Sequence, residues 1–211
     1  MKQNKKNVRK SRINDFIDAA SEIIADKGYE RTSVDSIART LDITSGTMFY
    51  HFKTKGDLLE IIIMKGITVG IEKIRASIDV APKGVLHQFC ALVNAHITII
   101  QSEHWHFHRV WMQEWDKLSD DSKRRLHPLI LQYRCILDSL LTSLAREGYL
   151  RGDILTFRHI LLPALNWTTA WVRFPEKDIQ TRLAEQICAT SLNQPLEEFR
   201  ALMSREGGAD T

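Results

Sequence analysis

Two groups of residues in this 211-residue chain carry side chains that can do chemistry. The first lies between residues 32 and 55 and is rich in hydroxyls, with an imidazole and two lysines among them. Such groups donate hydrogen bonds to phosphate oxygens and to base edges. The second lies between residues 104 and 115 and combines histidine with tryptophan. Neither group includes a nucleophile–base–acid set, a phosphate-binding loop, a dinucleotide fingerprint or a metal triad. The sequence favours binding, and we do not expect an enzyme.

The first group requires helices to position it. A preceding helix is indicated by apolar residues at spacings of three and four, namely Ile13, Phe16, Ile17, Ala20, Ile23 and Ile24. Gly28 is well placed to end this helix as a left-handed C-cap. Residues 32–35, Thr-Ser-Val-Asp, spell a capping box before a short segment with apolar residues up to Leu41. The pattern predicts a packing helix followed by a second, short helix.

Two further helices complete this arrangement. Thr44 is suited to cap a third short helix that runs through His51. Residues 54–57, Thr-Lys-Gly-Asp, spell another capping box and open a long fourth helix, which Pro82 and Gly84 end. Two short helices joined by a tight turn and preceded by a packing helix form a helix-turn-helix, which places its second helix in the major groove of DNA.

Basic residues are concentrated at the same end of the chain. Residues 1–55 hold 11 lysines and arginines against 7 acids, whereas the rest of the chain holds 18 against 19. Residues 1–12 contain six of these cations and no acid, as a phosphate-seeking arm requires. The alternative for these twelve residues is a solvated tail.

A family resemblance rests on residues 32–59, Thr-Ser-Val-Asp-Ser-Ile-Ala-Arg-Thr-Leu-Asp-Ile-Thr-Ser-Gly-Thr-Met-Phe-Tyr-His-Phe-Lys-Thr-Lys-Gly-Asp-Leu-Leu. This segment resembles the DNA-binding signature of TetR/AcrR-type regulators. The resemblance covers about a quarter of the chain strongly, and the remainder is similar only in length and helical character. Two departures stand out: Leu41-Asp42-Ile43 replaces the commoner Ala-Gly-Val of the turn, and Phe49 stands where a tyrosine often reaches phosphate.

The resemblance implies roles for matching positions. Short side chains at the start of the third helix let its backbone approach base edges. The aromatic, imidazole and lysine side chains that follow this start contact phosphate or a thymine methyl. Met48 and Phe52 are expected to pack inward. The candidate DNA-binding residues are Thr32, Ser45, Gly46, Thr47, Phe49, Tyr50, His51 and Lys55. The alternative is a three-helix cap whose aromatic residues only fill its own core.

The rest of the chain is also predicted to be helical. We expect helices at about residues 85–101, 104–116, 121–147, 154–173 and 177–192, and a short one from Pro195 through Leu202, with Pro128 kinking or dividing the third of these. No segment of this part of the chain shows a strand pattern that would argue against these helices. The expected fold class is all-α, with a helix-turn-helix DNA-binding domain at residues 1–55 and a helical effector-binding and dimerisation domain at residues 56–211.

Four aromatic and imidazole side chains form a stripe in this second domain. His104, His108, Trp111 and Trp115 lie at positions i, i+4, i+7 and i+11 of a predicted helix. Regulators resembling this chain use helices five to seven as a ligand chamber, which the stripe could line; the alternative, which the sequence favours, is core with satisfied histidines. His106 points elsewhere on the helix, and no further ligand beyond Glu103 has suitable spacing, so we expect neither a metal nor a cofactor.

Residues 165–174 resemble, more weakly, a stretch in the members of that family that sense acyl-CoA thioesters. Arg173 could meet a carboxylate or a CoA phosphate, or offset the helix macrodipole. The resemblance also implies that the last two long helices form a dimeric four-helix bundle. Its expected apolar surface comprises Ile160, Leu161, Ala164, Leu165, Trp167, Thr168 and Trp171.

These observations combine into one expectation. The chain is expected to be a cytoplasmic, homodimeric regulator that binds double-stranded DNA at a pseudo-palindromic operator, as a repressor that a small apolar or acyl-CoA-like effector releases. No stretch is long and apolar enough to cross a membrane, and no signal peptide is expected. Cys90, Cys135 and Cys188 are expected to be buried, reduced thiols. An adapter that uses the helix-turn-helix for protein contacts is the alternative.

Overall fold

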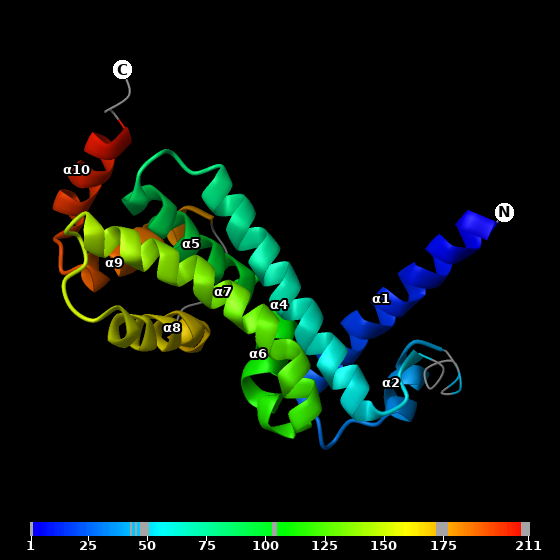
Figure 1. The fold of residues 1–211 in the computed structure, drawn as a ribbon. Coiled ribbons are helices and arrows are strands. Elements are labelled where there is room, and N and C mark those ends of the chain that lie inside the picture. The colour runs from blue at the N-terminus through cyan, green and yellow to red at the C-terminus, as the bar shows by residue number, and fades with distance from the viewer. Residues whose placement is uncertain are drawn as a thin grey trace. The chain divides into compact units, whose positions relative to one another are not determined.

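The computed structural model describes residues 2–42, 44, 46, 51–102, 105–171 and 177–207, and every regular element in those ranges is helical. Figure 1 shows the helices in chain order. They are α1 (Lys2–Lys27), α2 (Val34–Thr40), α4 (Lys55–Asp79), α5 (Val85–Gln101), α6 (Trp105–Glu114), the 3-10 turn η1 (Trp115–Lys117), α7 (Asp120–Arg146), α8 (Ile154–Trp171), α9 (Lys177–Ser191) and α10 (Leu196–Gly207). The predicted all-α class is confirmed.

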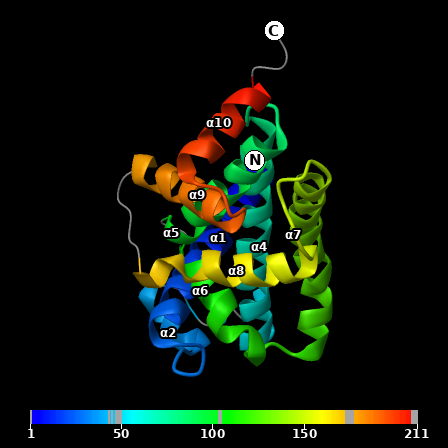
Figure 2. The same cartoon turned by 90° about the vertical axis from the view of Figure 1, so that its left-hand side faces the viewer.

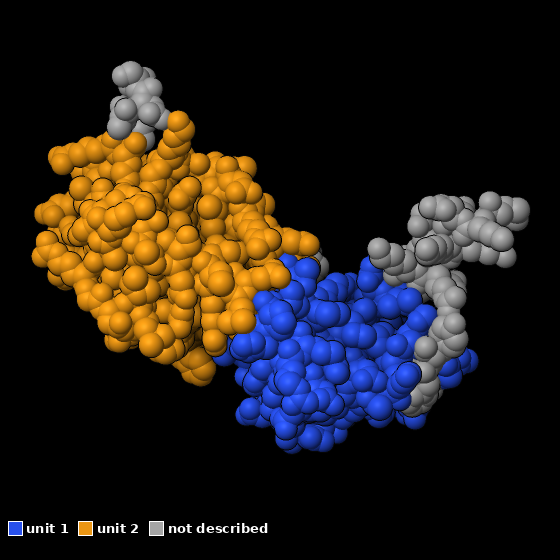
Figure 3. Space-filling model, viewed as in Figure 1, with its two compact units in different colours: residues 1–68, 104–129 blue, residues 69–103, 130–211 orange. Residues whose placement is uncertain are grey.

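The chain divides into two compact units, which do not follow chain order (Figure 3). Unit 1 comprises residues 1–68 and 104–129, and unit 2 comprises residues 69–103 and 130–211. Helices α4 and α7 each contribute their first part to unit 1 and the rest to unit 2. The functional boundary that we placed after residue 55 stays a prediction.

Unit 1 is built around the packing helix α1, which contacts both α2 and α6. Its core contains Phe16 and Phe52, whose rings stack with centroids 5.6 Å apart. Phe52 is 2% exposed, as its predicted inward packing requires. Apolar residues of α2 and α4, Ile37 and Leu58 among them, are fully buried in the same unit.

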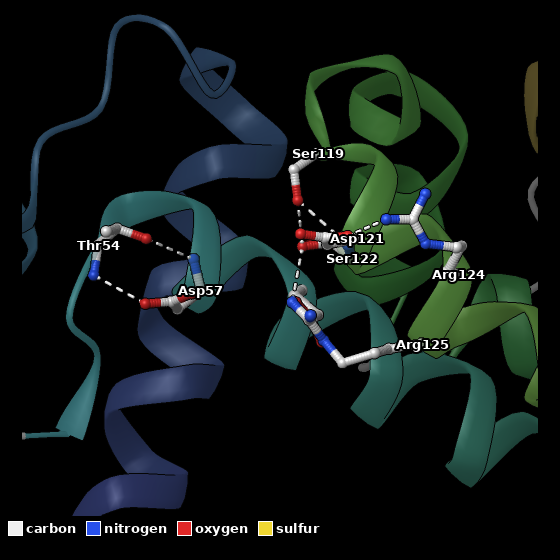
Figure 4. Close-up of polar contacts among 8 residues, drawn as sticks. Thr54, Asp57, Ser119, Asp121, Ser122, Arg124 and Arg125 are labelled. Atoms are coloured by element: carbon white, nitrogen blue, oxygen red, sulfur yellow. Dashed lines mark hydrogen bonds and ion pairs between the residues drawn. The ribbon is translucent and has the colours of Figure 1, made fainter.

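Capping interactions set the helix ends in unit 1. Gly28 ends α1 with a φ of +83°, the left-handed conformation that glycine adopts without strain. The first capping box lies one residue later than its spelling indicated, because Ser33 is the N-cap and exchanges hydrogen bonds with Ser36. The second is as predicted: Thr54 Oγ1 accepts from the Asp57 amide, and Asp57 Oδ2 accepts from the Thr54 amide, both at 3.0 Å (Figure 4).

A close approach between α4 and α6 also defines unit 1. A Cβ placed on Gly66 of α4 would lie 2.9 Å from the Cβ of Phe107, so the missing side chain lets the two helices pack closely. The neighbouring Lys65 pairs with Asp18 of α1, and its Nζ lies 5.1 Å from the centroid of the Phe107 ring. These contacts tie α6 to the N-terminal helices.

Unit 2 is centred on α5, which packs against α8, α9 and α10 (Figure 2). Its bounds, Val85–Gln101, are those predicted. Residues from α5, α7, α8, α9 and α10 share one apolar core, which includes Phe89, Leu141 and Phe199. Cys90 and Cys188 are buried in it, as expected, but Cys135 is exposed, so the prediction for that thiol is wrong.

Two predicted helix features are decided by the structure. Of the two alternatives for Pro128, division of the helix is excluded, because Pro128 lies inside the continuous α7. The terminal helix α10 extends to Gly207, beyond the predicted end at Leu202, and Glu206 near its end accepts a 3.0 Å hydrogen bond from the Leu86 amide. That carboxylate occupies the space beside Gly84 (φ +118°), where any Cβ would clash with it.

Candidate functional site

The first turn of α4 carries Lys55, one of the predicted phosphate ligands. The Lys55 Nζ lies 3.9 Å from the centroid of the Tyr29 ring, in the turn after α1. The Tyr29 hydroxyl reaches the same helix turn, 4.0 Å from the position of a Cβ on Gly56. Burial, and then the nearby carboxylates of Glu30, Asp57 and Glu114, raise the pKa of Tyr29, so its hydroxyl stays protonated and can donate.

A buried carboxylate holds Tyr29 in place. Glu114, the last residue of α6, is 9% exposed, and its Oε1 accepts the Tyr29 backbone N–H at 3.0 Å. Sequence reasoning missed both residues. A buried acid must find a donor, but no spacing rule indicates a donor 85 residues away.

Thr32 lies in the turn that follows Tyr29. Its side chain is 2% exposed and donates to the Gly28 carbonyl at 2.9 Å, while its backbone N–H donates to the Tyr29 carbonyl at 3.1 Å. The hydroxyl thus stabilises the turn, and a phosphate contact by Thr32 stays a prediction.

The predicted base-reading segment is described only in part. Gly46 is exposed, with open space where a Cβ would lie. His51 is half-buried, with its ring centroid 6.3 Å from that of Phe52. Ser45, Thr47, Phe49 and Tyr50 lie outside the described residues, as does Met48. Their DNA-binding roles stay predictions.

A second polar group in unit 1 links α4 to the start of α7 (Figure 4). Arg125 donates to both carboxylate oxygens of Glu60, at 2.7 and 2.6 Å, and to Ser122 Oγ at 3.3 Å. The hydrogen bonds from Arg125 lower the pKa of Glu60. This bidentate pair fixes the start of α7 against α4. On α4, Glu60 lies five residues after Lys55.

The aromatic stripe is only partly a feature of one helix. The buried face of α6 is formed by His106, Phe107, Val110 and Glu114. His108 and Trp111 are half-buried on another side, with ring centroids 6.2 Å apart, so His106 does point elsewhere as predicted. Because α6 ends at Glu114, Trp115 falls in the η1 turn and does not continue the helical spacing. His104 and Arg173 lie outside the described residues.

Unit 2 contains a buried polar triad that sequence reasoning missed. His96 of α5 is 8% exposed and bonds to the Tyr133 hydroxyl through Nδ1 at 2.8 Å and to Asn166 Oδ1 through Nε2 at 2.9 Å. Since Asn166 Oδ1 can only accept, Nε2 carries the proton and Nδ1 accepts from Tyr133. Burial lowers the pKa of His96 to about 4 and raises that of Tyr133.

Neither a metal centre nor a membrane span lies among the residues that the structure describes. Among the described residues, no three histidine, cysteine or acidic side chains cluster so that they could hold a metal ion. Of the helices in the described ranges, none combines the length and apolar character needed to cross a bilayer.

The described helices α1, α2 and α4, followed by a larger helical body, fit the arrangement that the sequence predicts for a DNA-binding transcriptional regulator. Two family models match this chain: bacterial regulatory proteins of the tetR family, at residues 16–62, and the tetracyclin repressor-like C-terminal domain, at residues 83–193. The chain therefore belongs to the tetR family of bacterial regulatory proteins.

The chain is also similar to individual proteins and solved structures. The chain is 26% identical to the fatty acid metabolism regulator protein of Bacillus subtilis (strain 168) over 166 residues, which cover 77% of this chain and 84% of that protein. It is 30% identical to the superantigen PfiT in a solved structure, with a TM-score of 0.72 over 83% of this chain and 93% of that one. A structure of AibR in complex with isovaleryl coenzyme A and operator DNA is 17% identical, with a TM-score of 0.74 over 84% of this chain and 96% of that one.

Proposed function

We propose that this protein is a homodimeric repressor that leaves its operator when it binds an acyl-CoA-like or other apolar effector. The observation that carries the DNA-binding part is the match to the tetR-family model over residues 16–62, with Lys55 at the N-terminus of α4 inside it. A helix N-terminus carries partial positive charge, and a lysine beside it adds to the attraction for phosphate. Lys55 and His51 are the described residues that we assign to phosphate.

The base-reading residues follow from the same assignment. Ser45, Gly46 and Thr47 are proposed to meet base edges, and Phe49 and Tyr50 to complete the contact surface on DNA. Selection of DNA from random-sequence pools by the purified protein tests this proposal directly. An enriched pseudo-palindrome, bound with steep salt dependence, is the expected outcome. Failure to enrich any sequence would contradict it.

A second copy of the chain is proposed to cover the outer face of α8. Ile160 and Trp167 are 68% and 69% exposed, and the exposed Ala164 lies between them at spacings of four and three residues. Leu161, Leu165 and Thr168 instead point into the protomer's own core, so only part of the predicted interface set is available. The side chain of Trp171 lies outside the description. Two exposed large apolar side chains on one helix face favour an interface.

The effector class is inferred from the relatives and from the aromatic residues. The matched Bacillus protein is named for fatty acid metabolism, and the AibR structure contains isovaleryl coenzyme A. We propose that His104, His108, Trp111 and Trp115 contribute to an acyl-CoA site; the contact of Arg173 with a CoA phosphate stays a prediction. Half-buried aromatic rings suit an acyl chain, and a guanidinium suits a CoA phosphate.

Fluorescence anisotropy of labelled operator, titrated with acyl-CoA thioesters of increasing chain length, tests this release. Free coenzyme A and the matching free fatty acid separate the contributions of the nucleotide and acyl parts. We expect the intact thioester to release DNA at lower concentration than either part. Release by none of the three would contradict the proposed effector class.

A protein-binding role is the second candidate, since the relative that is 30% identical is named a superantigen. In that case the helix-turn-helix would serve contacts with another protein. The two candidates differ in one measurement, because DNA binding through phosphates weakens steeply with salt. A chain that binds no duplex at low salt would favour the second candidate.

A further inference from the structure

We propose that Tyr29 is a positioning residue for DNA binding: its ring holds the Lys55 ammonium at the N-terminus of α4, and Glu114 of α6 holds Tyr29. This inference rests on the proposed function, in which Lys55 meets a DNA phosphate. All three residues belong to unit 1.

The ring restricts Lys55 without using its hydrogen bonds. A lysine side chain has four rotatable bonds, and ordering it on phosphate costs conformational entropy. The Lys55 Nζ lies 3.9 Å from the Tyr29 ring centroid, within the range of a cation–π interaction. That attraction acts through the ring face and leaves the three N–H donors of the ammonium for a phosphate. The lysine is therefore held near its binding position before DNA arrives.

Tyr29 is itself fixed by backbone contacts on both sides. Its N–H donates to Glu114 Oε1 at 3.0 Å, and its carbonyl accepts from the Thr32 amide at 3.1 Å. Gly28 precedes it in the left-handed conformation, which sets the direction of the turn. The ring position consequently depends on a carboxylate at the end of α6, the helix that carries Trp111 and His108.

This arrangement predicts an effect that a purely stabilising contact would not have. If the ring only stabilised the fold, its loss would lower the melting temperature without changing the number of phosphate contacts. If it positions Lys55, its loss weakens DNA binding and also lowers the salt slope, which reports counterions released by phosphate contacts. A cation–π contact supports an effect of about two- to fivefold on affinity.

The test uses the full-length protein and an operator duplex selected by the wild type. Anisotropy titrations at several salt concentrations compare Tyr29→Leu, Tyr29→Phe, Lys55→Ala and the Tyr29→Leu/Lys55→Ala double variant. Lys73→Ala, which removes an exposed lysine farther along α4, is the charge control. We expect Lys55→Ala to lower the salt slope by about one. Tyr29→Leu should weaken DNA binding about two- to fivefold and, like Lys55→Ala, lower the salt slope. Tyr29→Phe, which keeps an aromatic ring, should have the affinity and the salt slope of the wild type.

The double variant and the Glu114 variants test whether Tyr29 acts through Lys55 and depends on Glu114. Tyr29→Leu should have no further effect once Lys55 is absent. Glu114→Ala should reproduce the loss of Tyr29→Leu, whereas Glu114→Gln, which keeps an acceptor oxygen, should not. This pair decides the question if Tyr29→Leu fails to fold.

Two results would overturn the inference and are distinguishable. If Lys55→Ala lowers the slope but Tyr29→Leu and Glu114→Ala change neither affinity nor slope, Tyr29 does not position Lys55 and the proposed function stands. If Lys55→Ala itself has no effect, the phosphate contact in the proposed function fails, and the inference fails with it.

Discussion

His96 Nδ1 accepts a hydrogen bond from the Tyr133 hydroxyl at 2.8 Å, deep in unit 2. With Asn166 on its other nitrogen at 2.9 Å, the imidazole joins α5, α7 and α8 through its two ring nitrogens. The bond from Tyr133 needs a neutral ring, because protonated Nδ1 could no longer accept from the hydroxyl, whereas Nε2–H donates to Asn166 in either state. Burial enforces the same state by lowering the pKa of His96 to about 4.

Acid should therefore destabilise unit 2 through His96. The pKa of the imidazole is 6.5 when exposed and about 4 when folded, so between these values the unfolded chain binds a proton that the folded one does not. The contribution of neutral His96 to stability is fully present above pH 6.5 and is lost as the pH decreases toward 4. From pH 7 to pH 5 we expect a loss of about 2 kcal/mol from this residue.

Urea unfolding at pH 7 and pH 5 measures this loss. His96→Gln removes the titrating group and should flatten the pH dependence by about that amount, although it lowers stability at pH 7. His127→Gln, which removes an exposed histidine, is the matched control. An equal pH dependence in wild type and His96→Gln would refute the linkage.

Most helix bounds could be predicted because they depend on local signals. Gly28 ends α1, the Thr54–Asp57 box opens α4, and residues 85–101 form α5 with the predicted ends. The terminal helix α10 was underestimated because a distant partner supports its last turn, where Glu206 bonds to the Leu86 amide. Local propensity cannot indicate such a tertiary contact.

The candidate site was predicted less completely for the same reason. A motif identified Lys55, but its partner Tyr29 lies in another turn, and the residue that fixes Tyr29 lies on α6. The stripe ending at Trp115 was placed on one helix because spacing alone does not show where a helix ends. On α8, periodicity identified apolar residues without separating the inward Leu165 from the outward Trp167.

Replacing Gly66 by alanine should destabilise the protein by about 1–3 kcal/mol, because the new Cβ would lie 2.9 Å from the Phe107 Cβ in a closely packed contact. Gly70→Ala on the same helix is the matched control, since nothing lies within 4 Å of its Cβ position. There, the helix propensity of alanine should stabilise by up to about 1 kcal/mol. Thermal unfolding of both variants measures the difference, and equal shifts would mean that α6 is not packed against Gly66.

Replacing Trp167 by glutamate should weaken self-association, because a charge in a closed apolar interface must be desolvated. The side chain is 69% exposed in the protomer, so the fold itself should tolerate the change. Sedimentation velocity should give a dimer for the wild type and a shift toward monomer for the variant. Val80→Glu, at a position that is 83% exposed outside α8, is the control and should remain dimeric. A dimer of unchanged affinity in Trp167→Glu would place the interface elsewhere.

The effector response should depend on Trp111 but not on Trp105, although both lie on α6. Trp111 is half-buried beside His108, whereas Trp105 is 37% exposed and lies under the Arg109 guanidinium, 5.3 Å from its ring centroid. An effector shifts the DNA-binding equilibrium only by its differential affinity for the two states, so operator DNA must weaken effector binding by the same factor. Coupling of this kind is typically about 1–3 kcal/mol.

Titration calorimetry with an acyl-CoA that releases the wild type, in the presence and absence of operator, should show this difference in effector affinity for wild type and Trp105→Ala. Trp111→Ala should bind the effector more weakly and still bind operator when effector is absent. Equal effector affinity with and without operator would contradict the switch, and a Trp111→Ala variant that loses folding and DNA binding together would make Trp111 a core residue and not an effector contact.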